Sequence, residues 1–575
     1  MKNLLYFAFA LVLFTGCENF LDTETYTQKN TTNFPQNAAD VQMALIGAYN
    51  TLNTAVENPQ ASYFYAAELA SDDRFGGGGE NDKLMQAWDK LMNYSTDASK
   101  PYWKARYYGI FRTNSVINSI DAMGLTGADI KQAKGEALFL RAFFYHELAE
   151  MYGDVPLFTT TLTTNIPRTP AAEVYAQIAS DLKAAIDSLP AVTYDKTIAG
   201  HATKWAAEAL MARVYLFYTG FYKQTTLPLV GGGTVSKEDV VKWLDDCKTN
   251  SGQGLLGDFR DLWAYTNKYT KADWPLVQVN GLDGKPLEWA GDGNKESVFA
   301  IKFSNFAAWG TTIGYSNQYL LHFGIRGGQA YANTFPCGQG WGAGPVSPQL
   351  VADWNTQEPN DEIRRGGSVI DVNTLPAYSF GGWNDFMEET DFWQLKCVHI
   401  SAKNGKDSDG NDQYASSFSV LQFGATDNFQ LDGVNDLVLI RYADVLLMHS
   451  ELTETPDGIN LVRSRVGLPA VTYSLENLKK ERRFELAFEG RRWADIRRWG
   501  DASNLLAKQE GQPIYKAKTR TTMKAFGGGY KARYAATQGF FAIPESEISL
   551  SDGVLVQNPG YTGADGAYQG WQGIN

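Results

Sequence analysis

Residues that could catalyse a reaction are present, but their spacing matches none of the common catalytic patterns. The chain has five histidines: His146, His201, His322, His399 and His449. None of them forms an H-E-x-x-H motif, and no G-x-S-x-G elbow or phosphate-binding loop occurs. The adjacent carboxylates Asp72 and Asp73 could act as a glycosidase pair, but the sequence does not give the separation that such a pair requires. We therefore predict that the chain is not an enzyme.

The sequence gives little support for a metal site or a disulfide bond. Asp407, Asp409, Asn411 and Asp412 stand in a segment like a calcium loop, but it lacks the glycine at position six and the final glutamate of an EF-hand. We favour a solvated loop there, and Ca²⁺ is the one cofactor that the segment leaves open.

Beyond residue 17 the cysteines are Cys247, Cys337 and Cys397. Their odd number allows one bridge at most within the chain, and no C-x-x-C pair is present.

The N-terminus has the pattern of a secretory signal. Lys2 precedes an apolar run over residues 4–14, which is too short to cross a bilayer of ~30 Å as a helix. Residues 14–17, Phe-Thr-Gly-Cys, resemble a bacterial lipobox, in which the cysteine is diacylated and becomes the new N-terminus. We expect a signal peptide at 1–16 and lipidation of Cys17. The alternative is an ordinary signal peptide followed by an incidental cysteine.

The charge of the chain argues against nucleic-acid binding. It carries 64 acidic and 51 basic residues, a net charge of −13 over 575 residues. Such a surface repels phosphate backbones.

Helical periodicity dominates residues 39–255. We predict helices over 39–52, 101–123, 128–151, 169–189 and 203–218, with another opened by Ser236. In the strongest of them, the apolar side chains at positions 137, 140, 144, 148 and 151 fall on one face. Helices of this length joined by short turns indicate stacked hairpins like tetratricopeptide repeats, although no strict 34-residue repeat is present.

The pattern changes after residue 255, where glycine, tryptophan and asparagine rise and helical periodicity is lost. Residues 297–303 and 540–544 read as short strands, and helices return over 435–500. We therefore predict a mainly α fold, a superhelix of tetratricopeptide-like hairpins with a loop-rich insertion that carries short strands. The expected organisation is 1–16 signal peptide, 17–38 lipidated tether, 39–255 helical scaffold, 256–434 insertion with ligand-binding loops, and 435–575 C-terminal helices and closing segment.

Seven sequence words, taken in order, resemble the SusD/RagB family of outer-membrane nutrient-binding lipoproteins. They are ELASDD (68–73), GEALFLRAFFY (135–145), YGDVPL (152–157), IRYADVLLM (440–448), ERRFELAFEGRRWADIRR (481–498), IPESEI (543–548) and NPGY (558–561). Residues 17–22 also resemble the start of that family's mature chains. The resemblance spans nearly the whole sequence.

The charged words look structural rather than ligand-binding. In 481–498, Arg491 and Asp495 are spaced i,i+4 and Asp495 and Arg498 i,i+3, beside an apolar stripe. We interpret this segment as ion pairs packed between helices, although an anion site is the alternative. Five other residues receive the same interpretation: Arg141, Tyr152, Asp154, Arg441 and Asp444.

The resemblance implies that ligand residues lie in the loop after ELASD and in loops of the insertion. Neutral sugars are held by flat aromatic faces together with planar polar groups. The candidates are Asp73, Arg74, Asn81, Trp88, Trp309, Tyr315 and Trp341, with Tyr319 and Trp383 as further aromatics. Four glycines at 76–79 could let a ligand approach closely or leave the loop mobile. Burial under a loop is the alternative for any one of these tryptophans.

The resemblance also implies a function and a place. The protein would sit on the extracellular side of the outer membrane through its lipid anchor and capture oligosaccharides. It would then deliver them to a SusC-type TonB-dependent transporter as a hinged lid. One alternative is capture of peptides, as in the RagB branch of the family, and another is a surface glycosidase.

Overall fold

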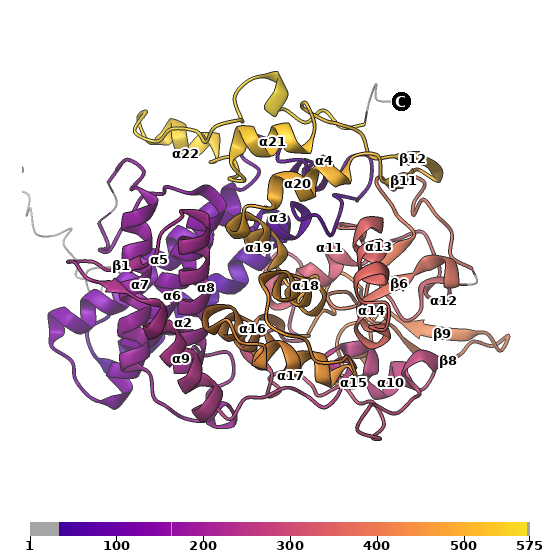
Figure 1. Cartoon of the computed structure of the whole chain (residues 1–575), viewed down its shortest axis with the longest axis horizontal. Helices are drawn as coiled ribbons and strands as arrows, with labels where there is room; N and C mark the ends of the chain where they lie inside the picture. Colours follow the sequence, from indigo (N-terminus) through magenta and orange to yellow (C-terminus); the bar gives the residue numbers. More distant parts are fainter. Residues whose placement is uncertain (1–33, 163, 376, 572–575) are drawn as a thin grey trace, which may run out of the picture.

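The computed structural model describes residues 34–162, 164–375 and 377–571, and it is mainly helical (Figure 1). Long helices form the part drawn in indigo and magenta. They are α2 (Ala38–Val56), α5 (Lys100–Met123), α6 (Ala128–Tyr152), α7 (Ala171–Ser188), α8 (Lys204–Phe221) and α9 (Lys237–Asn250). Two short helices, α3 (Tyr63–Leu69) and α4 (Lys83–Asp89), lie between α2 and α5 in sequence.

These long helices confirm the helices predicted from the sequence, and their ends have clear local causes. The Ser236 side chain accepts from the backbone N–H of Asp239, whose carboxylate accepts from the backbone N–H of Ser236, so α9 opens with a capping box. Thr203 caps α8 through the N–H of Ala206. Neighbouring helices pack in sequence order from α5 to α9, and α2 packs on α5, so the predicted stack of hairpins is confirmed.

The C-terminal helices extend this stack and cross it. They are α16 (Tyr442–Thr453), α17 (Asp457–Arg465), α18 (Leu475–Glu485), α19 (Arg492–Trp499), α20 (Ala502–Leu506), α21 (Tyr530–Thr537) and α22 (Glu545–Leu550). Helix α16 packs on α9, and α19 packs on α8. Figure 1 shows α16 to α19 between the scaffold and the rest of the molecule, while α20 to α22 run along one edge.

Residues 256–434 form short helices and two-stranded sheets. The helices are α10 (Lys268–Lys271), α11 (Gln318–Phe323), α12 (Tyr331–Thr334), α13 (Pro348–Gln357), α14 (Glu362–Ser368) and α15 (Phe418–Phe423). This region has an apolar core of its own, which includes Trp274, Ile370, Phe386 and Trp393. The domain boundaries predicted from the sequence remain predictions.

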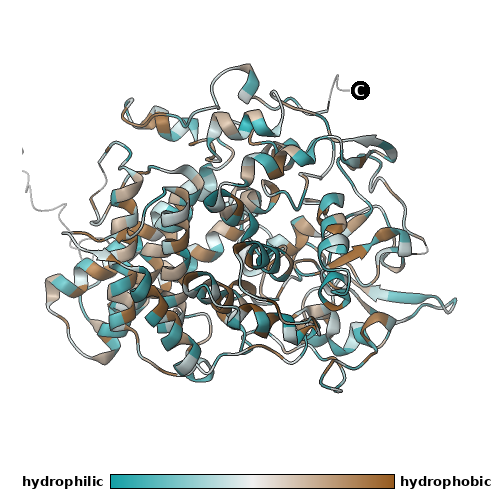
Figure 2. Cartoon of the chain, in the orientation of Figure 1, coloured by the Kyte–Doolittle hydropathy of each residue, from teal (hydrophilic) through white to brown (hydrophobic). Residues whose placement is uncertain are grey.

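The strands pair two by two, within and outside this region. The pairs are β1 (Leu227–Pro228) with β2 (Thr234–Val235), β3 (Ser297–Ile301) with β10 (Leu437–Arg441), β4 (Ile325–Arg326) with β5 (Gln339–Gly340), β6 (Val369–Asp371) with β7 (Phe392–Gln394), β8 (Ala402–Lys406) with β9 (Asp412–Ala415), and β11 (Pro513–Lys516) with β12 (Thr519–Thr522). Figure 2 shows brown, apolar residues inside the helix stack and a teal, polar β8–β9 hairpin that projects from the molecule.

Two expectations about strands and helices need correction. The predicted strand at 297–303 is present as β3, but its partner β10 falls where helix was expected from residue 435. Residues 437–441 are extended because they pair with β3, and the helix begins only at Tyr442. Residues 540–544 form no strand. Isolated hydrogen bonds hold them in place of a strand ladder. For example, the N–H of Phe541 donates to the carbonyl of Met151 at 2.8 Å.

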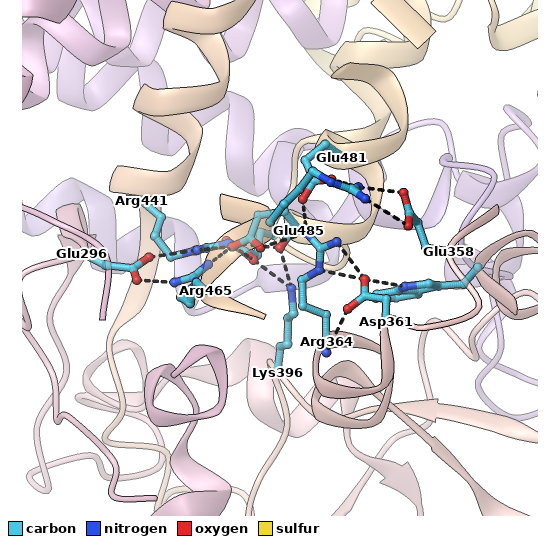
Figure 3. Close-up of polar contacts among 12 residues, drawn as sticks. Glu296, Glu358, Asp361, Arg364, Lys396, Arg441, Arg465, Glu481 and Glu485 are labelled. Carbon is cyan, nitrogen blue, oxygen red and sulfur yellow. Dashed lines mark hydrogen bonds and ion pairs between the residues drawn. The ribbon is translucent and has the colours of Figure 1, made fainter. Parts of the chain in front are cut away.

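A buried network of ion pairs ties the 256–434 region to the C-terminal helices (Figure 3). Glu485 lies at its centre and pairs with Arg441 at 2.7 Å, with Arg364 at 3.3 Å and with Arg465. Burial alone would raise the pKa of Glu485, but these guanidinium groups hold it well below its usual range. The expected structural role of the 481–498 and Arg441 words is therefore confirmed.

The pair predicted between Asp495 and Arg498 is also present, at 2.9 Å. The second partner of Asp495, however, is Arg482 at 2.8 Å rather than the Arg491 expected from spacing.

Several predictions lie outside the described residues or stay open. The signal peptide, Cys17 and the tether up to residue 33 are not described. Within the ranges given above, none of the helices combines the length and apolarity needed to cross a lipid bilayer. Cys247, Cys337 and Cys397 are buried and free in the same ranges. The described residues contain no group of three or more acidic, histidine or cysteine side chains that could hold a metal ion.

Candidate functional site

The glycine-rich loop between α3 and α4 is a close junction of backbones. A Cβ atom on Gly76 would lie 2.4 Å from the Cα of Gln86, and one on Gly77 would lie 2.3 Å from the carbonyl oxygen of Gly342. Backbone bridges join Gly77 to Ala343 and Gly79 to Phe386, and residues 76–79 are buried. The glycines therefore serve the packing of this loop against residues 342–346 and 386, and they leave no opening for a ligand.

Two candidates from this loop belong to the buried framework. Arg74 is 0% exposed, pairs with Glu68 at 2.6 Å and lies between two phenylalanine rings, with its guanidinium 4.6 and 4.7 Å from their centroids. Asp73 is also buried, and its carboxylate accepts from Arg483 at 2.8 Å. Neither side chain can meet a ligand from solvent, so the placement of these two residues on a binding surface is corrected.

Trp88 is buried as well. It is 2% exposed, its indole N–H donates to the carbonyl of Gln60 at 2.8 Å, and its ring meets Phe541 edge to face. Tyr319 lies in the core too, where its hydroxyl bonds Ser62 at 2.8 Å. The alternative of burial is therefore the correct one for Trp88, and Tyr319 is buried as well.

The surface next to this loop carries a polar cluster centred on Arg326, at the end of β4. Its guanidinium binds Asp385 through two hydrogen bonds of 2.9 and 2.6 Å, and it donates to Asp82 at 2.9 Å and to the carbonyl of Trp341 at 3.0 Å. Because the guanidinium is planar and bidentate, it fixes both carboxylates in direction. The Asp82 and Asp385 side chains remain 34% exposed, so each keeps acceptor sites open to solvent.

Trp383 supplies a flat face beside this cluster. Its ring lies under the Arg326 guanidinium, with 5.0 Å between the guanidinium carbon and the ring centroid. It also packs so closely on Gly327 that a Cβ there would lie 2.2 Å from the indole. The side chain is nevertheless 46% exposed. We call Asp82, Arg326, Trp383 and Asp385 the Trp383 platform.

Two sequence-predicted residues lie next to this platform. Asn81 is exposed and directly precedes Asp82. Trp341 is half-buried, its carbonyl oxygen accepts the hydrogen bond from Arg326, and its ring centroid lies 4.6 Å from that of His322. Burial lowers the pKa of His322 to about 3, so this ring is a neutral wall at ordinary pH. An aromatic face beside carboxylates, a guanidinium and an amide suits a neutral polyhydroxylated ligand.

Trp309 and Tyr315 stand in a different loop, over residues 304–316. Trp309 is 51% exposed and Tyr315 41%, and Phe306 beside them is 74% exposed. The loop is fastened to the end of α2, where the Asn53 amide donates to the carbonyl of Gly314 at 3.1 Å. The predicted residues therefore fall into three groups. Some are buried, some lie at or next to the Trp383 platform, and Trp309 and Tyr315 lie in a second, exposed loop.

Sequence reasoning missed Asp82, Arg326 and Asp385. They follow no motif, and Arg326 and Asp82 are 244 residues apart. One sequence feature could have pointed to this site: the Gly-Gly pair at 327–328, because Gly327 packs on Trp383.

Two family models match the chain. Residues 19–216 match the model described as "Starch-binding associating with outer membrane", and residues 295–561 match the SusD family model. "SusD-like protein P2" of Formosa agariphila is 22% identical over 560 residues, which cover 92% of this chain and 94% of the relative.

Solved structures share the fold. A "Laminarin binding SusD-like protein" superposes with a TM-score of 0.66 at 23% identity and covers 92% of this chain and 100% of its own. Surface glycan-binding protein A from Bacteroides thetaiotaomicron, in complex with laminarihexaose, gives a TM-score of 0.63 at 20% identity, with 90% and 99% coverage.

Proposed function

Since this chain belongs to the SusD family of non-catalytic, outer-membrane-associated binding proteins, we propose that it captures neutral oligosaccharides on the bacterial surface at the Trp383 platform. The observation that carries the proposal is the exposed indole of Trp383, fixed on Gly327 and flanked by two half-exposed carboxylates. A sugar ring would stack its C–H face on the indole, and its hydroxyls would donate to Asp82 and Asp385.

We further propose that the captured glycan passes to a SusC-type TonB-dependent transporter, with lipidated Cys17 as the anchor. The family resemblance and the lipobox at residues 14–17 support this part. The names of the similar structures support β-glucans such as laminarin as the first ligands to test, and the name of the family model adds starch.

Trp383→Ala tests the site. Removing the stacking face should weaken retention in affinity electrophoresis on laminarin or starch gels, whichever retains the wild type, by about ten-fold or more, since one central aromatic contributes roughly 2 kcal/mol. The fold should survive because the side chain is 46% exposed. Tyr108→Ala, which removes another aromatic that is 56% exposed, is the matched control and should retain binding.

Unchanged retention of Trp383→Ala, together with loss of retention in Trp309→Ala, would move the site to the 304–316 loop and contradict the assignment. Equal loss in Tyr108→Ala would show that the effect is not specific to the platform.

A further inference from the structure

A cavity separate from the Trp383 platform opens between the insertion and the strands β3 and β10. Its empty space is about 840 Å³ with the open mouth included, and about 90 Å³ of this can hold the centre of a water molecule. Trp263, Trp289, Asp292, Asn435, Phe64 and Phe488 are among the residues that line it. We call it the Trp263 cavity. None of the four platform residues lines it.

The floor of this cavity is part of the ion network in Figure 3, and its charges are already paired. Arg441 binds Glu489 at 2.9 Å and Glu296 at 3.0 Å, and Lys396 binds Glu489 at 2.9 Å. Because each of these groups already has a partner and is held by the network, the floor is rigid and does not itself need a ligand.

Two hydrogen-bond donors on the walls have no partner among the described residues. They are the indole N–H of Trp263 and the side-chain amide of Asn435, and both nitrogen atoms are buried. A buried donor is costly to leave unpaired, and more than ~90% of buried polar groups in native structures are paired. Two such donors on one cavity indicate that an acceptor enters it.

The charges on the walls decide which class of acceptor fits. The wall carboxylates already have cationic partners: Glu296 pairs with Arg441 and Arg465, Glu489 with Arg441 and Lys396, and Asp436 with Lys302. A charged ligand would therefore find no free counter-charge in the cavity, and burying it there without a partner is costly. A metal or ammonium ion would meet the positive ends of the two free N–H groups. A neutral molecule with several oxygen atoms satisfies both conditions.

Size and shape narrow the ligand further. This space holds several waters, which is on the order of the volume of one sugar ring. The flat ring of Trp289 on its wall suits the C–H face of a sugar. We propose that the Trp263 cavity binds a single neutral sugar ring, whose hydroxyl oxygens accept hydrogen bonds from Trp263 and Asn435. The proposal of this second site is independent of the proposal for the Trp383 platform.

Crystals of the protein soaked with D-glucose, D-galactose or D-mannose give the direct test. The proposal expects one of these sugars in the cavity, with hydroxyl oxygens at hydrogen-bond distance from both donors. Ordered waters alone on both donors, with all three sugars, would overturn it.

Calorimetric titration of detergent-solubilised full-length protein with the same sugars gives the second test. Trp263→Phe and Asn435→Asp each remove one donor with little change of shape, and each should weaken binding at least ten-fold. Tyr108→Phe, at an exposed ring that belongs to neither site, is the control and should leave this binding unchanged. Equal affinity of wild type and both donor variants would overturn the proposal.

The two sites fail separately in these experiments. Loss of oligosaccharide retention in Trp383→Ala with normal monosaccharide binding leaves the Trp263 cavity standing. If the wild type is retained on polysaccharide gels but the soaked crystals show only waters in the cavity, the second site is rejected and the proposed function still holds.

Discussion

Arg326 is the residue on which the Trp383 platform depends. One buried guanidinium, 9% exposed, holds two carboxylates and one carbonyl and also covers the inner face of an indole. Its partners Asp82 and Asp385 come from segments far from it in sequence, which explains why the aromatic Trp383 could be chosen as a candidate and its polar neighbours could not. The sequence allows Trp383 to be proposed as an aromatic ligand contact. Only the fold shows that the carboxylates of Asp82 and Asp385 lie beside it.

His322 gives a prediction at the same scale, because it is buried next to Trp341 with a pKa of about 3 against an ordinary value of 6.5. The unfolded chain therefore binds a proton on His322 below about pH 6.5, whereas the folded chain does not until about pH 3. Stability from this residue is present above pH 6.5 and is lost as the pH falls from there toward 3.

We expect the wild type to lose about 1–2 kcal/mol more unfolding free energy than His322→Gln when the pH is lowered from 7 to 5. Urea denaturation at the two pH values measures the difference. An equal loss in both proteins would mean that His322 accepts a proton inside the fold.

At the scale of elements, the 76–79 loop shows how glycine can mislead. From sequence, four glycines permit a mobile loop or a close approach of a ligand. The structure shows a third outcome, in which they allow backbone to pack on backbone, and that outcome depends on residues 342–346 and 386.

Gly77→Ala tests this interpretation. Gly77 has φ +72° and a Cβ there would lie 2.3 Å from the carbonyl oxygen of Gly342. Gly231→Ala is the matched control, with φ +79° and no heavy atom within 4 Å of the added carbon. The control should cost about 1 kcal/mol from backbone strain alone, whereas Gly77→Ala should cost at least ~2 kcal/mol more from the clash. Similar melting temperatures for the two variants would show that the 76–79 loop is free to move.

The elements divide clearly into those that local sequence determines and those that it does not. Helices such as α6 and α9 were predictable within a few residues, because an apolar face and a capping serine are local signals. The strand β10 was missed because its extended shape comes from pairing with β3, more than a hundred residues earlier. The same long-range packing buries Trp88, for which the sequence offered both an exposed and a buried interpretation.

At the scale of the whole molecule, residues 256–434 contribute to both candidate sites, and the ion network fixes this region to the helical scaffold. The network joins Arg364 and Lys396 of the insertion to Glu485 and Glu489 beside α18. Buried charges of this kind are costly to separate, since removing one partner of a buried pair costs about 3–5 kcal/mol. Residues 256–434 are therefore expected to move with the helical scaffold as one body.

The central claim is that this molecule retains oligosaccharides without altering them. Binding of purified full-length protein to an array of glycans and peptides, followed by product analysis of the retained ligands, tests it most directly. We predict saturable binding to neutral glycans, recovery of those glycans uncleaved, and loss of the signal in Trp383→Ala. Retention of peptides in place of glycans, or release of shortened oligosaccharides, would contradict the account.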